Sequence, residues 1–307
     1  MKRSPFTALC QQVARLAKPR RADLHVHTTA SDGEYTPSQV VALAKQAGLC
    51  AVAVTDHDTL AAVAEAVATA RTLSGPVIEV IPGVEITTEF DGRELHLLGY
   101  FVRTDHAELC TTLARLCARR RDRFRDYIAR LAANGHAIPP DRARLVEEAT
   151  ASPGRRHVAK LLLDCGFART RDEAFHRFLG PLRGTVMAKE LIPIGDAIAL
   201  AHAAGGVASL AHPPPTLTDD QFDRLAALGL DAVEAEYAWR RSSPGNRLRR
   251  TAARLSLATT GGSDCHGPDP AHRRIGTYAV TGDDLERLRE RCGVGSTGPL
   301  ASSEHLG

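Results

Sequence analysis

No stretch of this sequence is long and apolar enough to span a membrane as a helix. Its first residues lack the apolar segment of a signal peptide, so we expect a cytoplasmic protein. Its seven cysteines are an odd number without any Cys-x-x-Cys pair, which argues against a disulfide framework and for a reducing compartment. The formal net charge of +3 is too small to draw nucleic acid to the molecule as a whole.

What the sequence does contain is an ordinary share of apolar residues, 43%, arranged in alternating strand-like and helix-like segments. Thr36-Pro37 begins a helix that Gly48 ends, and a buried strand at 50–55 precedes an alanine-rich helix at 60–73. The same rhythm returns from 194 to 291. Such alternation predicts an α/β fold with a parallel sheet.

A change of pattern divides the chain. Residues 104–189 show helical periodicity without a strand, so we expect a helical insertion between two halves, 21–103 and 190–292, of one domain. Residues 1–20 are expected to form an arm with a short amphipathic helix, and 293–307 a loose tail.

Two strand assignments depend on local turn signals. Pro82-Gly83 is expected to bend the chain between strands at 77–80 and 83–89, ahead of a hairpin turn at Asp91-Gly92. A last strand is expected at 275–280, before the last helix.

The first predicted strand ends in two histidines. Side chains alternate between the faces of a strand, so His25 and His27 share one side while Leu24 and Val26 point into apolar packing. Two imidazoles close together on a rigid strand form half of a metal site. Taken alone, the pair is also compatible with histidines buried for other reasons.

Further histidines and acids follow the ends of other predicted strands, the edge where α/β barrels carry their chemistry. His96, on the return strand of the hairpin, and Asp32, in the first loop, are within reach of the same edge. The nine candidate metal ligands are His25, His27, Asp32, His57, Glu85, His96, His212, Asp264 and His266. Imidazole and carboxylate suit zinc, iron and manganese, and nine ligands are enough for two or three ions. Clustered ions activate water for displacement at phosphorus.

Seven separated motifs occur in order along the chain. They are Asp23-Leu24-His25-Val26-His27, Ser31-Asp32-Gly33, Thr55-Asp56-His57-Asp58, Gly83-Val84-Glu85, His96, Ala211-His212-Pro213 and Gly262-Ser263-Asp264-Cys265-His266-Gly267. This set resembles the polymerase-and-histidinol-phosphatase (PHP) family over about 21–102 and 190–281. The chain looks most like the bacterial branch that hydrolyses nucleoside 3′,5′-bisphosphates and trims short RNA from its 5′ end.

The resemblance implies an α/β fold of one kind, a distorted (β/α)7 TIM-like barrel with the helical insertion over its mouth. It also implies two or three divalent or trivalent ions of manganese, iron or zinc, and a hydroxide bridging two ions as the nucleophile. One ion would take His25, His27, Glu85 and Asp264; a second would share Glu85 and take His96 and His212; a third would take Asp32, His57 and His266. Four of these residues are also predicted to be catalytic: His57, Glu85, Asp264 and His266.

Substrate contacts are expected from the insertion and the borders of the barrel. The family branch has an Arg-x-His motif that matches Arg155-Arg156-His157. Arg155 and His157 are therefore candidates to hold a second phosphate or to protonate the leaving oxygen, although solvated charges at a helix start fit the sequence equally well. Lys189 and Arg240 are further phosphate-contact candidates. The run that contains Arg240 departs from the usual family pattern.

Seven arginines between 115 and 130 form a dense basic run on the long predicted helix. We favour a solvated helix face, the usual fate of such runs, over a track for an RNA backbone. Phe124 and Tyr127 are the aromatic residues in the run, fewer than a nucleic-acid surface needs.

The expected function is that of a metal-dependent phosphoesterase acting on a phosphorylated small molecule, a nucleotide, or short RNA, with no membrane and no obligate protein partner. One alternative is a small-metabolite phosphatase such as a histidinol phosphatase. Another is a non-catalytic PHP binding domain, which predicts missing ligands, whereas all nine positions are filled. An amidohydrolase would need a lysine at a barrel strand end, and Lys160 and Lys189 lie in or beside the insertion.

Overall fold

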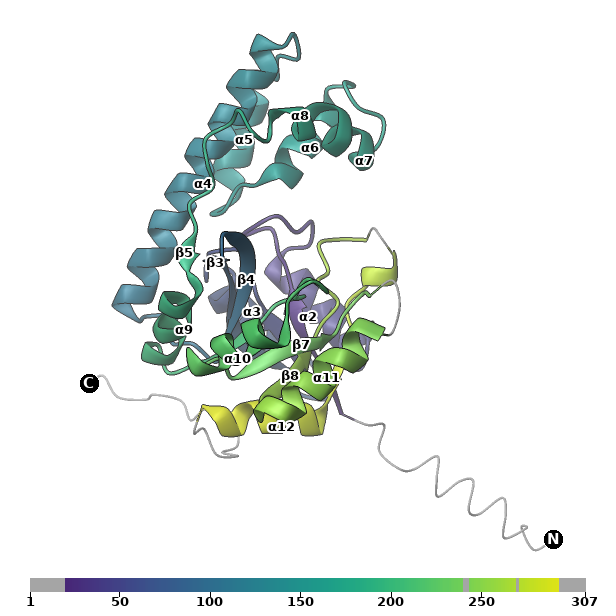
Figure 1. Ribbon diagram of the computed structural model, residues 1–307. Helices are drawn as coiled ribbons and strands as arrows, with labels where there is room; N and C mark the ends of the chain where they lie inside the picture. Colours follow the sequence, from purple (N-terminus) through teal and green to yellow (C-terminus); the bar gives the residue numbers. More distant parts are fainter. Residues whose placement is uncertain (1–19, 240–242, 269–270, 293–307) are drawn as a thin grey trace, which may run out of the picture.

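The structure, a computed structural model, describes residues 20–239, 243–268 and 271–292. Strands curl into a nearly closed barrel, helices surround it, and a second group of helices stands above its mouth (Figure 1). The expected α/β fold, a distorted TIM-like barrel, is confirmed. The predicted N-terminal amphipathic helix and the predicted tail lie outside the described residues.

Seven strands form the barrel wall, in the order β8-β7-β6-β4-β3-β2-β1. Their bounds are β1 (Arg21–Val26), β2 (Ala51–Val54), β3 (Glu79–Phe90), β4 (Arg93–Tyr100), β6 (Val207–Leu210), β7 (Ala232–Glu236) and β8 (Ala258–Gly261). Neighbouring strands are parallel except at β4, which runs antiparallel to both β3 and β6. This reversal distorts the barrel relative to an all-parallel one.

The barrel closes where the segment after β8 meets β1. The backbone N–H of Asp264 donates to the carbonyl of His25 at 2.8 Å, and that of His27 donates to the carbonyl of Cys265 at 3.0 Å. A Cβ at Gly262 would lie 2.4 Å from the backbone nitrogen of His25, so only glycine fits this approach. The closure brings His25 of β1, and His27 just after the strand, beside Asp264.

Helices cover the outside of the barrel. They are α2 (Pro37–Gln46), α3 (Val63–Thr72), α9 (Ile194–Ala203), α10 (Asp219–Ala227), α11 (Ser243–Leu255) and α12 (Gly282–Arg291). As predicted, α2 begins after Thr36, whose hydroxyl accepts the N–H of Gln39 in a capping box worth about 1 kcal/mol. Leu24 packs with Leu285 and Leu288 of α12. None of the described helices combines the length and apolar character that crossing a membrane requires.

Two strand predictions were wrong. Instead of bending at Pro82-Gly83, β3 continues from Glu79 to Phe90. Pairing with β2 ends at Pro82, and pairing with β4 begins at Gly83. Proline lacks a backbone N–H, but at this end of the β2 pairing the lost hydrogen bond costs the sheet little stability. The strand predicted at 275–280 is reduced to β9 (Val280–Thr281), which pairs antiparallel with β1. A turn precedes it, because the N–H of Gly276 donates to the buried carboxylate of Asp23 at 2.7 Å.

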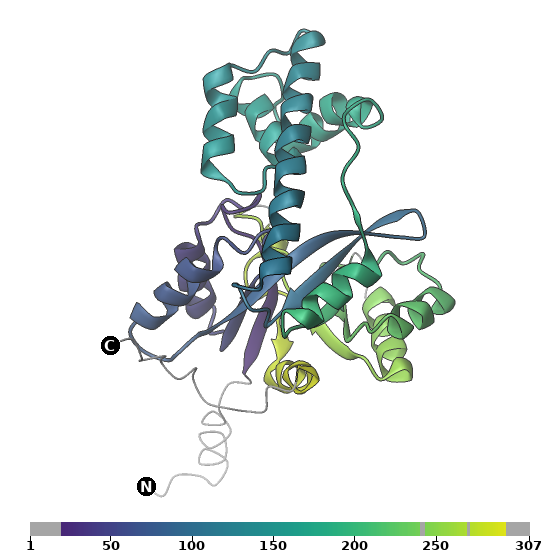
Figure 2. The same cartoon turned by 90° about the vertical axis from the view of Figure 1, so that its left-hand side faces the viewer.

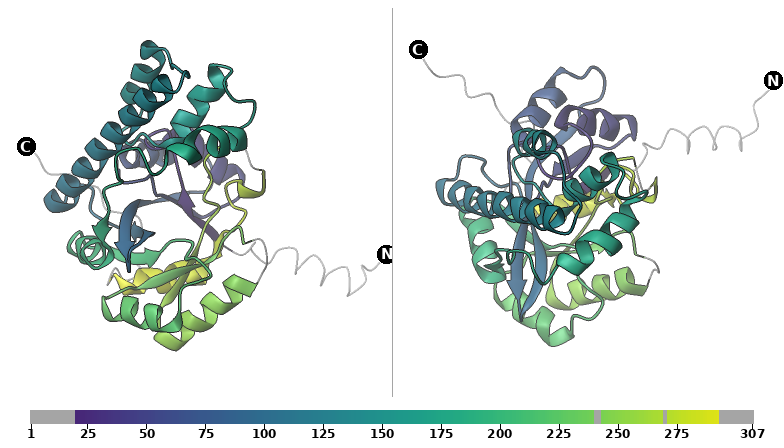
Figure 3. Two further views of the ribbon diagram at one scale, coloured as in Figure 1. Left: turned by 45° about the horizontal axis from the view of Figure 1, so that its top comes forward. Right: turned by 90° about the horizontal axis from the view of Figure 1, so that it is seen from above.

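The helices above the mouth are α4 (Ala107–Ala133), α5 (Pro140–Ala149), α6 (Arg155–Asp164), α7 (Arg171–Glu173), the π-helical turn η1 (Ala174–Leu179) and α8 (Gly180–Leu182). Figure 2 shows α4 rising from the side of the barrel into this group, and Figure 3 shows the group from above, over the mouth. The chain returns through β5 (Ile192–Pro193), which pairs with β3.

The apolar stripe of α4 serves two cores. Leu109, Leu113 and Leu116 pack in a cluster with barrel side chains, whereas Phe124 and Leu131 pack in a separate cluster within the upper helices. We therefore propose that 104–189 is a lid domain inserted into a barrel formed by 21–103 and 190–292. We use the name lid for residues 104–189 below.

Candidate metal centre

All nine residues predicted as metal ligands meet at the mouth of the barrel. They form four overlapping groups in which the ligand atoms lie within 4.8 Å of one another: His27, Asp32, His57 and His266; His25, His27 and Asp264; His25, Glu85 and His212; His57, Glu85 and His96. Each of the nine belongs to at least one group, and within the described residues these groups contain no other side chain. Residues from opposite ends of the chain thus share one site.

Glu85 is the centre of the cluster. Its Oε1 lies 2.8 Å from Nδ1 of His96 and 3.0 Å from Nε2 of His212. Its Oε2 lies 3.0 Å from Nδ1 of His57, 3.2 Å from Nε2 of His27 and 3.4 Å from Nε2 of His25. A carboxylate with histidines on both oxygens is placed to bridge cations. The geometry differs from the division implied by the family in one respect, because His57 lies closer to Glu85, at 3.0 Å, than to Asp32, at 3.9 Å.

Asp32 and His266 form the second focus of the site. Oδ1 of Asp32 lies 3.2 Å from Nε2 of His266 and 3.9 Å from Nε2 of His57. The loop that carries Asp32 is held by Asp56, a buried acid that accepts the N–H of Thr28 at 2.7 Å and the hydroxyl of Ser31 at 2.5 Å. Asp56 thus shapes the site without belonging to the ligand groups.

Buried polar atoms at the centre of the cluster lack hydrogen bonds. In the described part of the chain, Oδ1 of Asp32, Nδ1 of His57 and Oε2 of Glu85 are buried without a hydrogen-bond partner. Leaving polar atoms buried and unpaired is costly, and metal coordination removes that cost. The donor set of imidazole nitrogens and carboxylate oxygens therefore fits divalent cations.

The cluster is electrostatically prepared for cations. Burial opposes the ionisation of Glu85, but His57, His96 and His25 hold its pKa well below the usual range. Burial also opposes the charged form of His27, yet Asp264 and Glu85 raise its pKa to about 9. For His57 burial prevails and lowers the pKa to about 4, so this ring offers an unprotonated nitrogen near neutral pH.

Three residues around the site have left-handed backbone conformations. Asp58, His212 and Asp264 have φ values of 54°, 27° and 50°. Such conformations cost about 1–3 kcal/mol each and occur mainly where the surroundings impose them. Here they direct the side chains of His212 and Asp264 into the cluster and that of Asp58 toward the lid.

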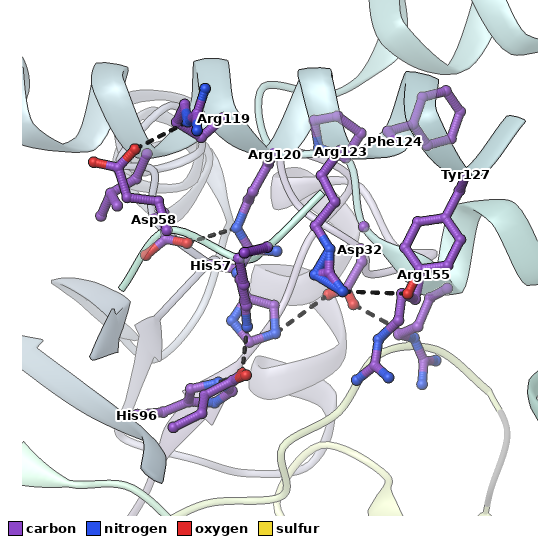
Figure 4. A pocket seen from close by; sticks show the side chains of 18 of the residues that line it. Asp32, His57, Asp58, His96, Arg119, Arg120, Arg123, Phe124, Tyr127 and Arg155 are labelled. Atoms are coloured by element: carbon purple, nitrogen blue, oxygen red, sulfur yellow. Dashed lines mark hydrogen bonds and ion pairs between the residues drawn. The ribbon is translucent and has the colours of Figure 1, made fainter. Parts of the chain in front are cut away.

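A pocket of about 420 Å³ lies between the cluster and the lid. Its floor includes Asp32, His57, His96 and His266, and its cationic lining consists of Arg119, Arg120, Arg123, Arg155, Arg156, Arg183 and Lys189. Figure 4 shows Arg120 and Arg123 pointing from α4 toward His57 and Asp32. Cations that surround the space above a cluster of acids and histidines are suited to an anionic ligand.

The structure describes three of the four predicted substrate contacts, and two of these line the pocket. Arg155 lines the pocket, with its Cζ 5.9 Å from the ring centroid of Phe175. Lys189 lines it too, and forms an ion pair with Glu94. His157 is not among the lining residues, and its Nδ1 accepts the N–H of Gly154 at 3.1 Å, which caps α6. Arg240 lies outside the described residues.

Most of the arginine run on α4 is engaged by acids. Arg115 and Arg119 pair with Glu190, and Arg125 contacts Glu147 at 2.6 Å. Arg130 contacts Asp126 at 3.1 Å. These pairs support the interpretation of a solvated helix face. Arg119, Arg120 and Arg123 are the members of the run that line the pocket, Arg119 while paired with Glu190.

Sequence reasoning missed several residues around the site. Glu234 contacts two ligand histidines, and Asp264 receives hydrogen bonds from Tyr237, at 2.9 Å, and from Arg273. Glu234 did carry a signal, because it is an acid inside a predicted strand, at 231–236. Arg273 carried none, since it lies in a short 3-10 turn, η2 (Ala271–Arg273), whose position depends on the whole fold.

The chain matches the PHP domain family over residues 23–164. It is 33% identical over 254 residues to a 5′-3′ exoribonuclease of Escherichia coli, a match that covers 81% of this chain and 86% of that protein. It is 28% identical over 259 residues to a 3′,5′-nucleoside bisphosphate phosphatase of Chromobacterium violaceum, covering 83% of this chain and 90% of the phosphatase.

A solved structure has the same fold. It is assigned as a metal-dependent phosphoesterase from Bifidobacterium adolescentis and superimposes with a TM-score of 0.81 at 29% identity. The match covers 89% of this chain and 98% of that one, so it includes both the barrel and the lid.

Proposed function

The chain belongs to the PHP family of metal-dependent phosphoesterases, and from this premise we propose that it hydrolyses a phosphate ester of a nucleotide, either a nucleoside 3′,5′-bisphosphate or the 5′ end of a short RNA. The observation that carries the proposal is the cation-lined pocket directly above nine metal-ligand side chains. Its volume of about 420 Å³ is in the range of small-molecule sites. The names of the two curated relatives, an exoribonuclease and a bisphosphate phosphatase, support these two substrate classes.

We propose that the nine candidate ligands would hold two or three cations, with Glu85 central because histidines lie beside both of its oxygens. When bound, the ions would activate water and neutralise charge on the phosphate oxygens. The protein's own cations would hold and orient the substrate: Arg155 and Lys189 are on the pocket wall, above the floor formed by His57 and His266. Arginine suits this task because its planar guanidinium binds phosphate through two N–H groups.

Arg156 is a better candidate than His157 for a substrate contact from the Arg-x-His motif. Its side chain is 25% exposed, lines the pocket, and reaches 3.8 Å from Oδ2 of Asp32. Its Nε and Nη2 are buried without a hydrogen-bond partner among the described residues. Burial accordingly lowers the pKa of this guanidinium. A phosphate oxygen in the pocket would satisfy both donors, so we propose that Arg156 binds substrate phosphate.

Arg156→Met is expected to lower kcat/KM for a nucleoside bisphosphate by about tenfold or more, because a hydrogen bond to a charged group contributes about 1.5–3 kcal/mol. Methionine retains the apolar part of the side chain and removes the donors. The matched control is Lys160→Met, on the same helix, since Lys160 is exposed and pairs with Asp164 at 2.8 Å. Equal kcat/KM for wild type and Arg156→Met would refute the assigned contact.

The substrate class is tested by measuring phosphate and nucleotide release from manganese-loaded protein. The panel is adenosine 3′,5′-bisphosphate, a short 5′-phosphorylated RNA, and histidinol phosphate. We expect turnover of the bisphosphate, of the RNA, or of both. Mononucleotide release from the RNA identifies an exonuclease, and attack on the bisphosphate alone identifies a nucleotide phosphatase. Turnover of histidinol phosphate alone would overturn the proposal in favour of a small-metabolite phosphatase.

A further inference from the structure

Glu234 is a buried acid in the barrel that is not one of the nine ligands. It lies on β7, its side chain has no exposure to solvent, and its two oxygens contact two different ligand residues. Oε1 lies 3.0 Å from Nδ1 of His25. Oε2 accepts the backbone N–H of His212 at 2.6 Å. A carboxylate is costly to bury, so these two contacts must hold it in place.

The contact with His25 determines which ring nitrogen faces the cluster. Because Nδ1 donates to Glu234, the neutral ring carries its proton there and leaves the lone pair of Nε2 free. Nε2 points into the cluster, 3.4 Å from Oε2 of Glu85 and 3.5 Å from Oδ1 of Asp264. A carboxylate behind a ligand histidine fixes its tautomer and ring orientation and makes it more basic.

The contact with His212 acts on the backbone. His212 has a φ of 27°, a conformation that residues other than glycine rarely adopt. The hydrogen bond to Glu234 anchors the N–H of this strained residue. Its side chain then reaches Glu85, with Nε2 3.0 Å from Oε1. One carboxylate therefore orients a side chain and a backbone turn that converge on the same partner.

We propose that Glu234 is a positioning residue for the metal site formed by His25, Glu85 and His212. The proposal rests on the metal centre of the proposed function and is independent of the substrate. Because Glu234 contacts the ligands and not the substrate, its removal acts on metal binding first and on hydrolysis only as a consequence.

Glutamine cannot replace Glu234, although it has the same shape. If its amide oxygen accepts from His212, its NH2 faces Nδ1 of His25 and demands a lone pair there. His25 would then carry its proton on Nε2, where the metal binds. If the amide is reversed, its NH2 meets the N–H of His212, donor against donor. Either orientation disrupts one of the two contacts.

The test compares the affinity of purified metal-free proteins for Mn²⁺ by equilibrium dialysis with elemental analysis. Glu234→Gln is expected to weaken binding by about 10- to 100-fold, the usual effect of removing a partner of a ligand histidine. The control is Ser209→Ala, which removes another buried polar contact of the barrel, 2.8 Å to Thr260, without touching a ligand. Its Mn²⁺ affinity should match that of wild type. Wild-type affinity in Glu234→Gln would overturn the proposal.

A second measurement uses no variant and so does not depend on one that folds. In zinc-loaded wild-type protein, nitrogen NMR should find the proton of His25 on Nδ1 and the metal on Nε2. The opposite assignment would overturn the proposal. Failure of the proposed function is distinguishable from both results, because neither measurement contains a phosphate ester.

Discussion

Asp264→Asn is expected to lower hydrolysis of the preferred nucleotide substrate by about a hundredfold or more. Oδ1 of Asp264 lies 3.2 Å from Nε2 of His27 and 3.5 Å from Nε2 of His25, so it is part of the proposed ligand shell. Asparagine removes its charge and keeps its size. Asparagine also tolerates the left-handed conformation of this position, φ 50°, so the loop should survive.

Metal content and activity should be measured together in Asp264→Asn. The matched control is Asp91→Asn, because Asp91 also has a left-handed backbone, φ 52°. Asp91 lies in the hairpin turn between β3 and β4 and pairs with Arg224 of α10, away from the metal centre. The control should retain full metal content and activity. An Asp264→Asn protein that hydrolyses substrate at the wild-type rate would show that Asp264 is not a functional ligand.

Arg120→Met is expected to destabilise the folded protein by about 3 kcal/mol, the range for breaking one side of a buried ion pair. Nε of Arg120, on α4 of the lid, donates to Oδ2 of Asp58 at 2.6 Å, and the two side chains are 11% and 1% exposed. Asp58 also accepts the N–H of Thr87 at 2.7 Å, so it is not left entirely unpaired. Without Arg120, the buried carboxylate of Asp58 has lost its cationic partner at the contact between lid and barrel.

Urea denaturation compares Arg120→Met with Arg119→Met, one residue away on the same helix. The pair between Arg119 and Glu190 is more exposed, 47% and 22%, so its loss should cost under about 1 kcal/mol. Equal stability losses in the two variants would contradict a special role for the buried pair. A loss confined to Arg120→Met supports its role in fastening the lid.

Most of the nine candidate ligands were predictable because they lie at or just after the end of a strand within a short motif, whereas Glu85 and His96 lie within β3 and β4. His25 and His27 share a face by strand alternation, and Asp264 and His266 follow β8, which neighbours β1 where the barrel closes. The ends of barrel strands converge whatever the details of the loops, so candidates at strand ends could be expected to share one site.

The supporting contacts were not predictable in the same way. Asp58 and Arg120 are 62 residues apart, and Glu234 and His25 are 209 apart, so no local pattern joins them. At the start of α6 the motif indicated the helix but not which side chains face the pocket. There Arg156 turns inward and His157 caps the helix. The predicted strand break at Pro82-Gly83 was wrong because pairing with β2 and β4 outweighed the turn signal.

Metal dependence of catalysis is tested most directly by the hydrolysis of adenosine 3′,5′-bisphosphate by protein that has been stripped of metal and then reloaded with manganese. We expect no phosphate release after chelation, recovery on reloading, and a bound-metal ratio of two or three ions per chain at full activity. Undiminished hydrolysis by protein shown to be free of metal would contradict this expectation.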